Sequence, residues 1–290
     1  MTIKVISTFI NYQKELQKSD RTLQSYQSDL QVFAQWFKEN NNETLSLVKI
    51  TPTDVRHFKR YLIDSGFKPS TISRKLLSIK YLLEWGWQTK RIQYRFPLPK
   101  LLKQVPSAPK WLKKTEQHAL VRHFEQIGLV RDLAIVKILL NTGLRIQELC
   151  NLKWSDIKLF ERKGSLIVRN SKGGKYRTVP LNKDARNAFL SLNYQNYKVS
   201  DKFVFQGQRG PLTPRGVQLM LNRHISKSNL SHISPHQLRH TFCKNLVNAN
   251  VSLEKVALLA GHEKLDTTKI YCKPSQSDLS DAVSLIGEEE

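Results

Sequence analysis

The sequence predicts a mainly α-helical protein of two domains, in which an all-helical N-terminal domain precedes an α+β domain with a small three-stranded antiparallel sheet. The chain has 290 residues, which is more than one compact core usually spans. Apolar residues recur three and four positions apart through most of the chain, as on one face of a helix. Residues 156–181 instead alternate apolar and polar side chains, with glycines at the turns, as short strands do.

The N-terminal domain is expected at residues 1–94 and is predicted to contain four helices. Residues 3–16 carry the first helical stripe, and Asp20 is expected to cap a second, longer helix. Pro52 and Pro69 suit the first positions of the third and fourth helices, where the amide proton that proline lacks would be unpaired anyway.

Basic side chains gather on the fourth predicted helix. Arg74, Lys75 and Lys80 are expected to lie opposite its apolar face. Such a face either contacts a nucleic acid backbone or is simply solvated, and the helix by itself does not separate the two interpretations.

A linker, a second domain and a tail are expected to follow. Residues 95–111 hold four prolines and four basic residues, Lys100 and Lys103 among them, and predict a stiff, extended linker suited to crossing a polyanion. The second domain is expected at residues 112–274. Residues 275–290 form a tail with a short apolar face, which is expected to dock on a neighbouring subunit unless it is a frayed end.

The second domain is predicted to contain both helices and strands. Strands are expected at residues 156–160, 165–170 and 175–181, and Gly173-Gly174 suits a tight hairpin between the last two. Helices are expected at residues 115–126, 129–142, 183–193, 214–226, 235–248 and 252–259.

The composition restricts the partner and the compartment. The formal net charge is +23, with basic residues in excess in both halves, which favours a polyanion such as DNA; a generally basic, ribosome-associated protein is the alternative. The N-terminus does not resemble a signal peptide, and no apolar run is long enough for a membrane span. Three cysteines without CxxC spacing indicate reduced thiols, so a cytoplasmic protein is expected.

Two segments carry basic groups placed for anion chemistry. Arg145 and Glu148 lie three residues apart on one helical face, so that the carboxylate can orient the guanidinium, although a surface ion pair would look the same. Ser234 suits a helix cap, which puts His236 and Arg239 near the first turn, where the helix dipole favours an anion.

The C-terminal part adds a possible nucleophile. Gly261 is expected to end a helix, leaving His262 just beyond it, and Asp266 suits the cap of a short helix that carries Tyr271. Taken singly, a buried core tyrosine is the commoner interpretation. Cys272 is a weaker candidate than the phenol beside it.

Two further patterns have alternatives. His236 and His240 have the i,i+4 spacing of a zinc protease helix, but Gln237 stands where that motif needs a glutamate and no third ligand is evident, so no metal is expected. Lys172 and Lys175 flank the glycine pair of the hairpin, where either can reach a DNA groove or be solvated; the spacing is not that of a P-loop.

Together these residues resemble the tyrosine recombinase (phage integrase) family. The resemblance is carried by residues 142–149, the Lys172 hairpin, residues 236–241 and residues 259–262, followed by Tyr271. It extends over nearly the whole chain and is closest to short members that resolve chromosome dimers or transposon cointegrates. Ala260 departs from the leucine often found there, which affects packing only.

The resemblance implies a set of roles. Tyr271 would attack a scissile phosphate to give a 3′-phosphotyrosyl link. Arg145 and Arg239 would bind the non-bridging oxygens, and Lys172, rather than Lys175, would protonate the departing 5′ oxygen. His236 would accept the Tyr271 proton or hold the phosphate, His262 would hydrogen-bond it, and Glu148 would support Arg145. Neither a metal nor a nucleotide cofactor is implied.

The resemblance also implies the assembly. The helical domain would be a SAM-like core-binding domain and the second domain the catalytic one, forming a C-shaped clamp on DNA with contacts from Arg74, Lys75, Lys80, Lys100, Lys103 and Lys175. A homotetramer would act on paired inverted-repeat sites through a Holliday junction, at the bacterial nucleoid. A type IB topoisomerase and a non-catalytic DNA-binding relative are the alternatives.

Overall fold

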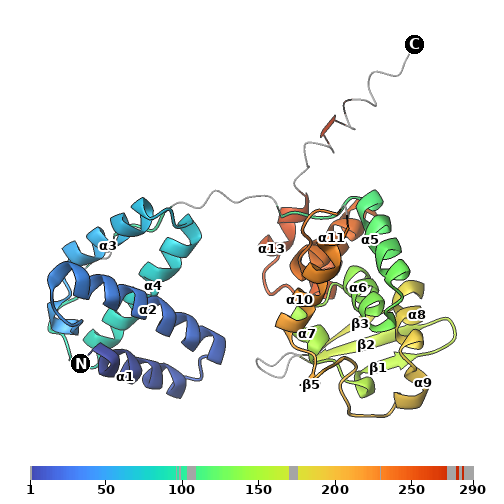
Figure 1. The fold of residues 1–290 in the computed structure, drawn as a ribbon, viewed down its shortest axis with the longest axis horizontal. Coiled ribbons are helices and arrows are strands. Elements are labelled where there is room, and N and C mark those ends of the chain that lie inside the picture. Colours follow the sequence, from blue (N-terminus) through green and yellow to red (C-terminus); the bar gives the residue numbers. More distant parts are fainter. Residues whose placement is uncertain are drawn as a thin grey trace. The chain divides into compact units, whose positions relative to one another are not determined.

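The computed structural model describes residues 2–95, 97, 99–102, 109–169, 176–228, 230–272, 279–280 and 283. The chain divides into two compact units, Met1–Pro106 and Ser107–Glu290 (Figure 1). The first is all-helical and the second combines helices with a small antiparallel sheet, as the sequence predicts. In the described part of the chain, no helix is both long and apolar enough to cross a membrane.

The described residues of the first unit form four α-helices around an aromatic core. Phe9, Phe33 and Phe58 are fully buried there. The rings of Phe33 and Phe58 pack edge to face, with their centroids 4.9 Å apart. The helices are α1 (Thr2–Glu15), α2 (Asp20–Asn41), α3 (Pro52–Asp64) and α4 (Pro69–Gln88), with a 3-10 turn at Leu47–Lys49.

The ends of these helices follow from local chemistry, with one difference from expectation. The hydroxyl of Ser19, and not the carboxylate of Asp20, caps α2 by accepting from the amide of Thr22. Thr51 and Asp54 form a reciprocal capping box that begins α3. Pro52 and Pro69 occupy the first helical turn of α3 and α4, as predicted.

A buried carboxylate on α2 binds basic side chains of α4, so that these are not all exposed as the sequence predicts. Asp29 is 1% exposed and accepts hydrogen bonds from Arg74, from Lys75 at 3.2 Å and from the hydroxyl of Ser78 at 2.9 Å. Lys75 is itself buried, so the expectation that it lies on the exposed face is wrong. An ammonium is buried only with a partner, and Asp29 provides one. Arg74 is half-exposed, and Lys80 lies on the surface.

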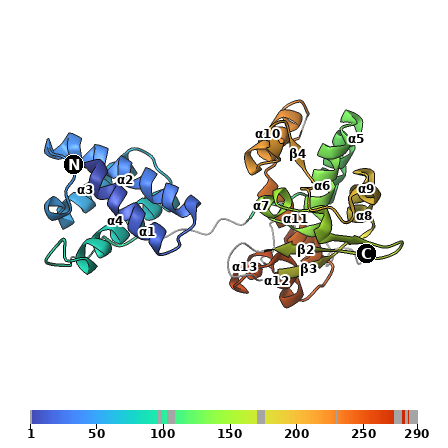
Figure 2. The same ribbon diagram turned by 90° about the horizontal axis from the view of Figure 1, so that it is seen from below.

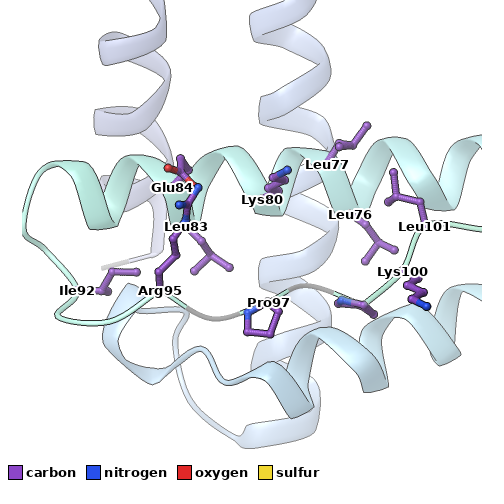
Figure 3. Close-up of a pocket in the computed structure, with 11 residues that line it drawn as sticks. Leu76, Leu77, Lys80, Leu83, Glu84, Ile92, Arg95, Pro97, Lys100 and Leu101 are labelled. Atoms are coloured by element: carbon purple, nitrogen blue, oxygen red, sulfur yellow. The ribbon is translucent and has the colours of Figure 1, made fainter.

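The chain beyond α4 turns back along that helix. Arg95 pairs with Glu84 at 2.7 Å, and the amine of Lys59 on α3 donates to the carbonyl of Lys100 at 2.7 Å. Arg95, Pro97 and Lys100 line an open pocket of about 500 Å³ together with side chains of α4, Lys80 among them (Figure 3). The first part of the predicted linker is therefore held against the first unit.

The second unit is built around α6 (Val130–Thr142). Ile135, Leu139 and Leu166 are fully buried in its core, and α8 and α11 pack against α6. The remaining helices are α5 (Lys114–Ile127), α7 (Ile146–Cys150), α8 (Lys183–Ser191), α9 (Tyr194–Tyr197), α10 (Pro214–Ile225), α11 (Pro235–Asn248), α12 (Leu253–Ala260) and α13 (Asp266–Lys269), with 3-10 turns at Trp154–Asp156 and Ile270–Cys272.

The sheet is a three-stranded antiparallel meander in the order β1-β2-β3, as predicted. Its strands are β1 (Ile157–Leu159), β2 (Gly164–Arg169) and β3 (Tyr176–Pro180), and Leu166 stands opposite Ile157 and Val179. Gly164 begins β2 rather than forming a turn. Helix α12 contacts both β3 and α11, so it lies beside the β3 edge of the sheet (Figure 2). A short hairpin, β4 (Gln206–Gly207) and β5 (Gly210–Pro211), was not predicted.

Candidate active site

Arg145 lies where α6 gives way to α7. Gly143 ends α6 with a left-handed backbone, and Arg145 then occupies the N-cap position of α7. The predicted ion pair is present, because Nη1 of Arg145 donates to Glu148 at 2.8 Å and its backbone amide donates to the same carboxylate at 2.7 Å. Nη2 reaches the carbonyl of Gly261 at 2.6 Å. Arg145 therefore joins α7 to the loop that carries His262.

Arg177 is a second guanidinium at this carboxylate, and the sequence analysis missed it. Both of its terminal nitrogens donate to Glu148 at 2.8 Å, and its Nε donates to the carbonyl of Leu259 at 3.0 Å. Burial opposes ionisation of Glu148, but Arg177 and then Arg145 outweigh it and hold the pKa of this carboxyl below its ordinary value. No local pattern marks Arg177, since a strand arginine is usually solvated.

The backbone at Gly261 fits closely against Arg177. Gly261 ends α12 with φ +67, and a Cβ at this position would lie 2.7 Å from Nη1 of Arg177. Glycine thus suits both the left-handed turn and the close approach of the guanidinium. The turn places His262 directly after the two carbonyls that Arg145 and Arg177 bind.

Arg239 is almost completely buried on α11. Ser234 caps this helix, as predicted, and Nη1 of Arg239 donates to the carbonyl of Gly143 at 2.5 Å. The side chain is 2% exposed, and Nη2 has no hydrogen-bond partner among the described residues. Burial, reinforced by the charge of Arg145, lowers the pKa of Arg239 to about 10, which still leaves it cationic at neutral pH. A buried cation with an unpaired donor favours an anion beside it.

Two histidine rings on α11 lead from Arg239 toward Tyr271. The rings of His236 and His240 meet edge to face with their centroids 4.2 Å apart. Nδ1 of His240 lies 2.6 Å from the hydroxyl oxygen of Tyr271, a hydrogen bond. The expectation from the sequence gave this contact to His236; the structure places His240 there. Burial lowers the pKa of both rings, to about 4 for His240, where the charges of His236 and Arg239 add to the effect.

His262 also contacts the phenol ring. Its ring stacks on that of Tyr271 with the planes 9° apart and the centroids 6.2 Å apart. Nδ1 of His262 and the hydroxyl of the buried Thr268 are 2.9 Å apart, which fixes the ring. Burial and the nearby Arg239 lower the pKa of His262 to about 4, so the ring is neutral at neutral pH.

Tyr271 is 1% exposed and belongs to a small core with Phe242, Cys243, Val256 and Ala260. Burial, with the Cys243 thiol beside it, raises the pKa of its hydroxyl far above the ordinary value. The phenol is therefore protonated at neutral pH. Cys272 next to it is exposed.

The structure gathers Arg145, Glu148, Arg239, His262 and Tyr271 around α11, and His236 adjoins them through His240. Lys172, Lys175 and Lys103 lie outside the described residues. In the part of the chain that the structure describes, no group of three histidine, cysteine or acidic side chains is placed to hold a metal ion. The arrangement combines cations, neutral imidazoles and one hydroxyl, a set suited to phosphodiester chemistry.

Comparison with known proteins gives consistent matches along the chain. The model of the phage integrase family matches residues 110–277, and that of the phage integrase N-terminal SAM-like domain matches residues 6–90. The tyrosine recombinase XerC of Bacillus licheniformis is 34% identical over 291 residues, which cover 94% of this chain and 93% of the relative. XerC of Pediococcus pentosaceus is 30% identical over 294 residues, covering 97% and 96%.

Solved structures share the fold. The XerH recombinase bound to palindromic difH in a post-cleavage complex has a TM-score of 0.73 at 23% identity, covering 92% of this chain and 80% of that one. A lambda integrase tetramer bound to a Holliday junction has a TM-score of 0.73 at 18% identity, covering 94% and 78%. With more than half of the chain matched by the family's own model, this protein belongs to the phage integrase family, the tyrosine recombinases.

Proposed function

We propose that this protein is a site-specific DNA recombinase that cuts and rejoins DNA through a 3′-phosphotyrosine at Tyr271 and a Holliday junction. Its likeness to XerC recombinases over nearly its whole length supports this activity. Resolution of replicon dimers and resolution or integration of a mobile element are the processes that fit.

The observation that carries the proposal is the unpaired donor of Arg239. Nη2 is buried and without a partner among the described residues. Arg239 lies close to Arg145 and to Tyr271, whose hydroxyl contacts the neutral His240 and whose ring stacks on the neutral His262. A non-bridging phosphate oxygen would supply the missing acceptor and the missing negative charge together. Charge-assisted hydrogen bonds of this type are the strongest that a phosphate can receive.

The remaining roles follow from the chemistry of attack on phosphorus. Arg145 and Arg239 stabilise the additional charge of the pentavalent transition state. His236 and His262 bind the phosphate as neutral donors, and Glu148 positions Arg145. Lys172 donates a proton to the 5′ oxygen, which would otherwise depart as an alkoxide. The phosphotyrosyl bond retains the energy of the broken ester, so that rejoining needs no nucleotide cofactor.

The substrate and the assembly are proposed on the same basis. The net charge of +23 suits duplex DNA, and exposed basic side chains at Arg74, Lys80 and Lys100 suit contacts to phosphates in the first unit. We infer that a homotetramer acts on paired inverted-repeat sites at the bacterial nucleoid, with the tail beyond residue 274 docking on a neighbouring subunit. The lambda integrase tetramer on a Holliday junction is the structural precedent.

A nicked suicide substrate tests the chemistry. Tyr271→Phe is expected to abolish the covalent protein–DNA product while DNA binding in a gel-shift assay stays within about twofold of the wild type. Tyr197→Phe is a matched control, because Tyr197 is 40% exposed on α9 and stacks on Trp154. Covalent product from Tyr271→Phe would overturn the assignment.

Topoisomerase activity is the alternative and needs a separate assay. A type IB enzyme relaxes supercoils without exchanging strands between specific sites. A supercoiled plasmid that lacks the recombination site is therefore expected to stay supercoiled. Rapid relaxation of this plasmid would favour the topoisomerase instead.

A further inference from the structure

The hydroxyl of Tyr271 lies beside the Cys243 thiol and is hydrogen-bonded to His240, a residue that the proposed roles leave unused. Nδ1 of His240 lies 2.6 Å from the phenol oxygen, whereas the His236 ring reaches the phenol only through His240. The centroids of the His240 and Tyr271 rings are 5.6 Å apart and the ring planes are tilted by 54°, so the rings do not stack and the contact is made through the nitrogen.

A phenol cannot attack phosphorus and keep its proton. The proton must leave as the bond to phosphorus forms, and a base that is already hydrogen-bonded to the hydroxyl is placed to receive it. Tyr271 is 1% exposed, so bulk water has almost no access to the resting hydroxyl. The acceptor must therefore be a neighbouring side chain.

His240 is in the protonation state that an acceptor needs. The titratable groups that face it among the described residues are His236 and Arg239 on α11, Tyr271 on the 3-10 turn and His262 after α12. Burial together with the first two lowers the pKa of His240 to about 4. The ring is thus neutral at neutral pH, and in the tautomer that carries its proton on Nε2 it accepts the hydroxyl proton of Tyr271 at Nδ1.

A weak base suffices when proton transfer accompanies attack. As the phenol oxygen bonds to phosphorus its proton becomes strongly acidic, so the acceptor need not match the pKa of free tyrosine. The entering phosphate also brings negative charge close to Arg239, which opposes the depression of the His240 pKa. In the resting protein both groups stay neutral, and the nucleophile is not ionised before DNA arrives.

Resting on the proposed function, we propose that His240 is a catalytic residue of strand cleavage, which holds the Tyr271 hydroxyl and receives its proton. The bond between the phenol oxygen and phosphorus forms, the bond between phosphorus and the 5′ oxygen breaks, and the phenol proton moves to Nδ1 of His240. Lys172 supplies the proton of the 5′-hydroxyl. In rejoining, the 5′-hydroxyl returns its proton to Lys172 as it attacks, and His240 returns its own to the departing phenol.

Single-turnover cleavage of the suicide substrate tests this role. His240→Phe removes the acceptor and is expected to form covalent product at least about 100-fold more slowly at neutral pH, with DNA binding retained. Between about pH 6 and about pH 9 its rate is expected to rise about tenfold per pH unit as the ionised fraction of the phenol grows, whereas the wild-type rate stays nearly flat. His240→Asn, which can accept a hydrogen bond but no proton, is expected to share this pH profile and keeps the experiment decisive if the phenylalanine variant does not fold.

A substrate with sulfur at the bridging 5′ position separates the two proton transfers, because a thiolate leaves without an acid. It is expected to restore cleavage by Lys172→Ala and not by His240→Phe. His118→Asn is the matched control, since His118 is exposed on α5. Cleavage by both His240 variants within about threefold of the wild type, or a loss that is equal at every pH, would overturn the role of His240. If the wild type itself forms no covalent product, the proposed function fails instead.

Discussion

Glu148 shows how one residue organises side chains that are distant in the sequence. It binds Arg145 three residues before it and Arg177 on β3, and the backbone carbonyls beside His262 bind the same two guanidiniums. The carboxylate balances one of the two positive charges, so a net positive charge remains for an anion. The pKa of Glu148 stays below its ordinary value, so this network is intact at neutral pH and weakens only in acid.

Gly143 is a second single residue on which the site depends, and its substitution is expected to lower the stability of the protein. A Cβ at Gly143 would lie 2.2 Å from Cδ1 of Phe242, whereas at Gly128, which also ends a helix with positive φ, nothing lies within 4 Å. Gly128→Ala is expected to lower the free energy of unfolding by about 1–2 kcal/mol, the cost of a left-handed alanine. Gly143→Ala is expected to lower the free energy of unfolding by about 1–3 kcal/mol more than Gly128→Ala does, because its Cβ also overlaps Phe242.

Urea unfolding of the two glycine variants measures the difference. Because Phe242 lies in the core of Tyr271, Gly143→Ala is also expected to slow covalent complex formation. Equal stability of the two variants would show that Phe242 moves aside at little cost.

At the scale of elements, the first unit depends on a buried ionic contact between two helices. Asp29 on α2 binds Arg74, Lys75 and Ser78 on α4, and the Lys75 side chain is only 6% exposed. Of the two adjacent basic residues on α4, Arg74 therefore remains partly at the surface, whereas Lys75 is buried. The helix periodicity located the helix but not the direction of the Lys75 amine.

Removing one partner of this buried pair is expected to cost more than removing both. Asp29→Leu leaves the Lys75 ammonium buried and is expected to lower the free energy of unfolding by about 3–5 kcal/mol. Combining it with Lys75→Met is expected to recover most of the loss, since apolar side chains can replace a buried ion pair. Glu43→Gln is the control, because Glu43 pairs with Lys49 at the surface.

Thermal or urea unfolding of the full chain, followed by tryptophan fluorescence, compares these variants. The first unit contains Trp36, Trp85 and Trp87, so its transition is visible in the whole protein. A double variant no more stable than Asp29→Leu would contradict the explanation from the buried ammonium.

At the scale of the whole molecule, the charge is the dominant property. A net charge of +23 on 290 residues favours contact with a polyanion along much of the surface, and such binding weakens as salt rises. The described basic residues are not equivalent in this respect. Lys80 and Lys100 are exposed, whereas Lys75 is neutralised by Asp29 inside the first unit.

Salt dependence of DNA binding distinguishes these lysines. Lys80→Ala and Lys100→Ala are each expected to reduce the slope of log K against log salt by about one, if each contacts one phosphate. Lys49→Ala is the control, since Glu43 already pairs with this lysine at 2.6 Å. Fluorescence anisotropy with a duplex, titrated at several salt concentrations, measures the slopes. An unchanged slope for Lys80→Ala and Lys100→Ala would remove both from the interface.

Much of the fold could be predicted because its signals are local. Capping residues, prolines at helix starts and apolar periodicity placed the starts of α3 and α4 and both ends of α11, and alternation located the sheet. The short elements α9, β4 and β5 could not be predicted, since two to four residues carry no period. Ser19 and Asp20 are both good caps, and only the backbone geometry chose between them.

From the sequence one could predict an all-helical and an α+β domain, the family and a set of side chains with complementary chemistry, because periodicity and motif spacing are properties of the linear chain. Tertiary structure alone decided which of them meet. It paired Arg177 with Glu148, buried Lys75 against Asp29 and gave the Tyr271 hydroxyl to His240. The two partners of each contact are separated by between 29 and 46 positions in the sequence. Whether side chains so far apart in the chain meet is fixed by packing and not by their spacing.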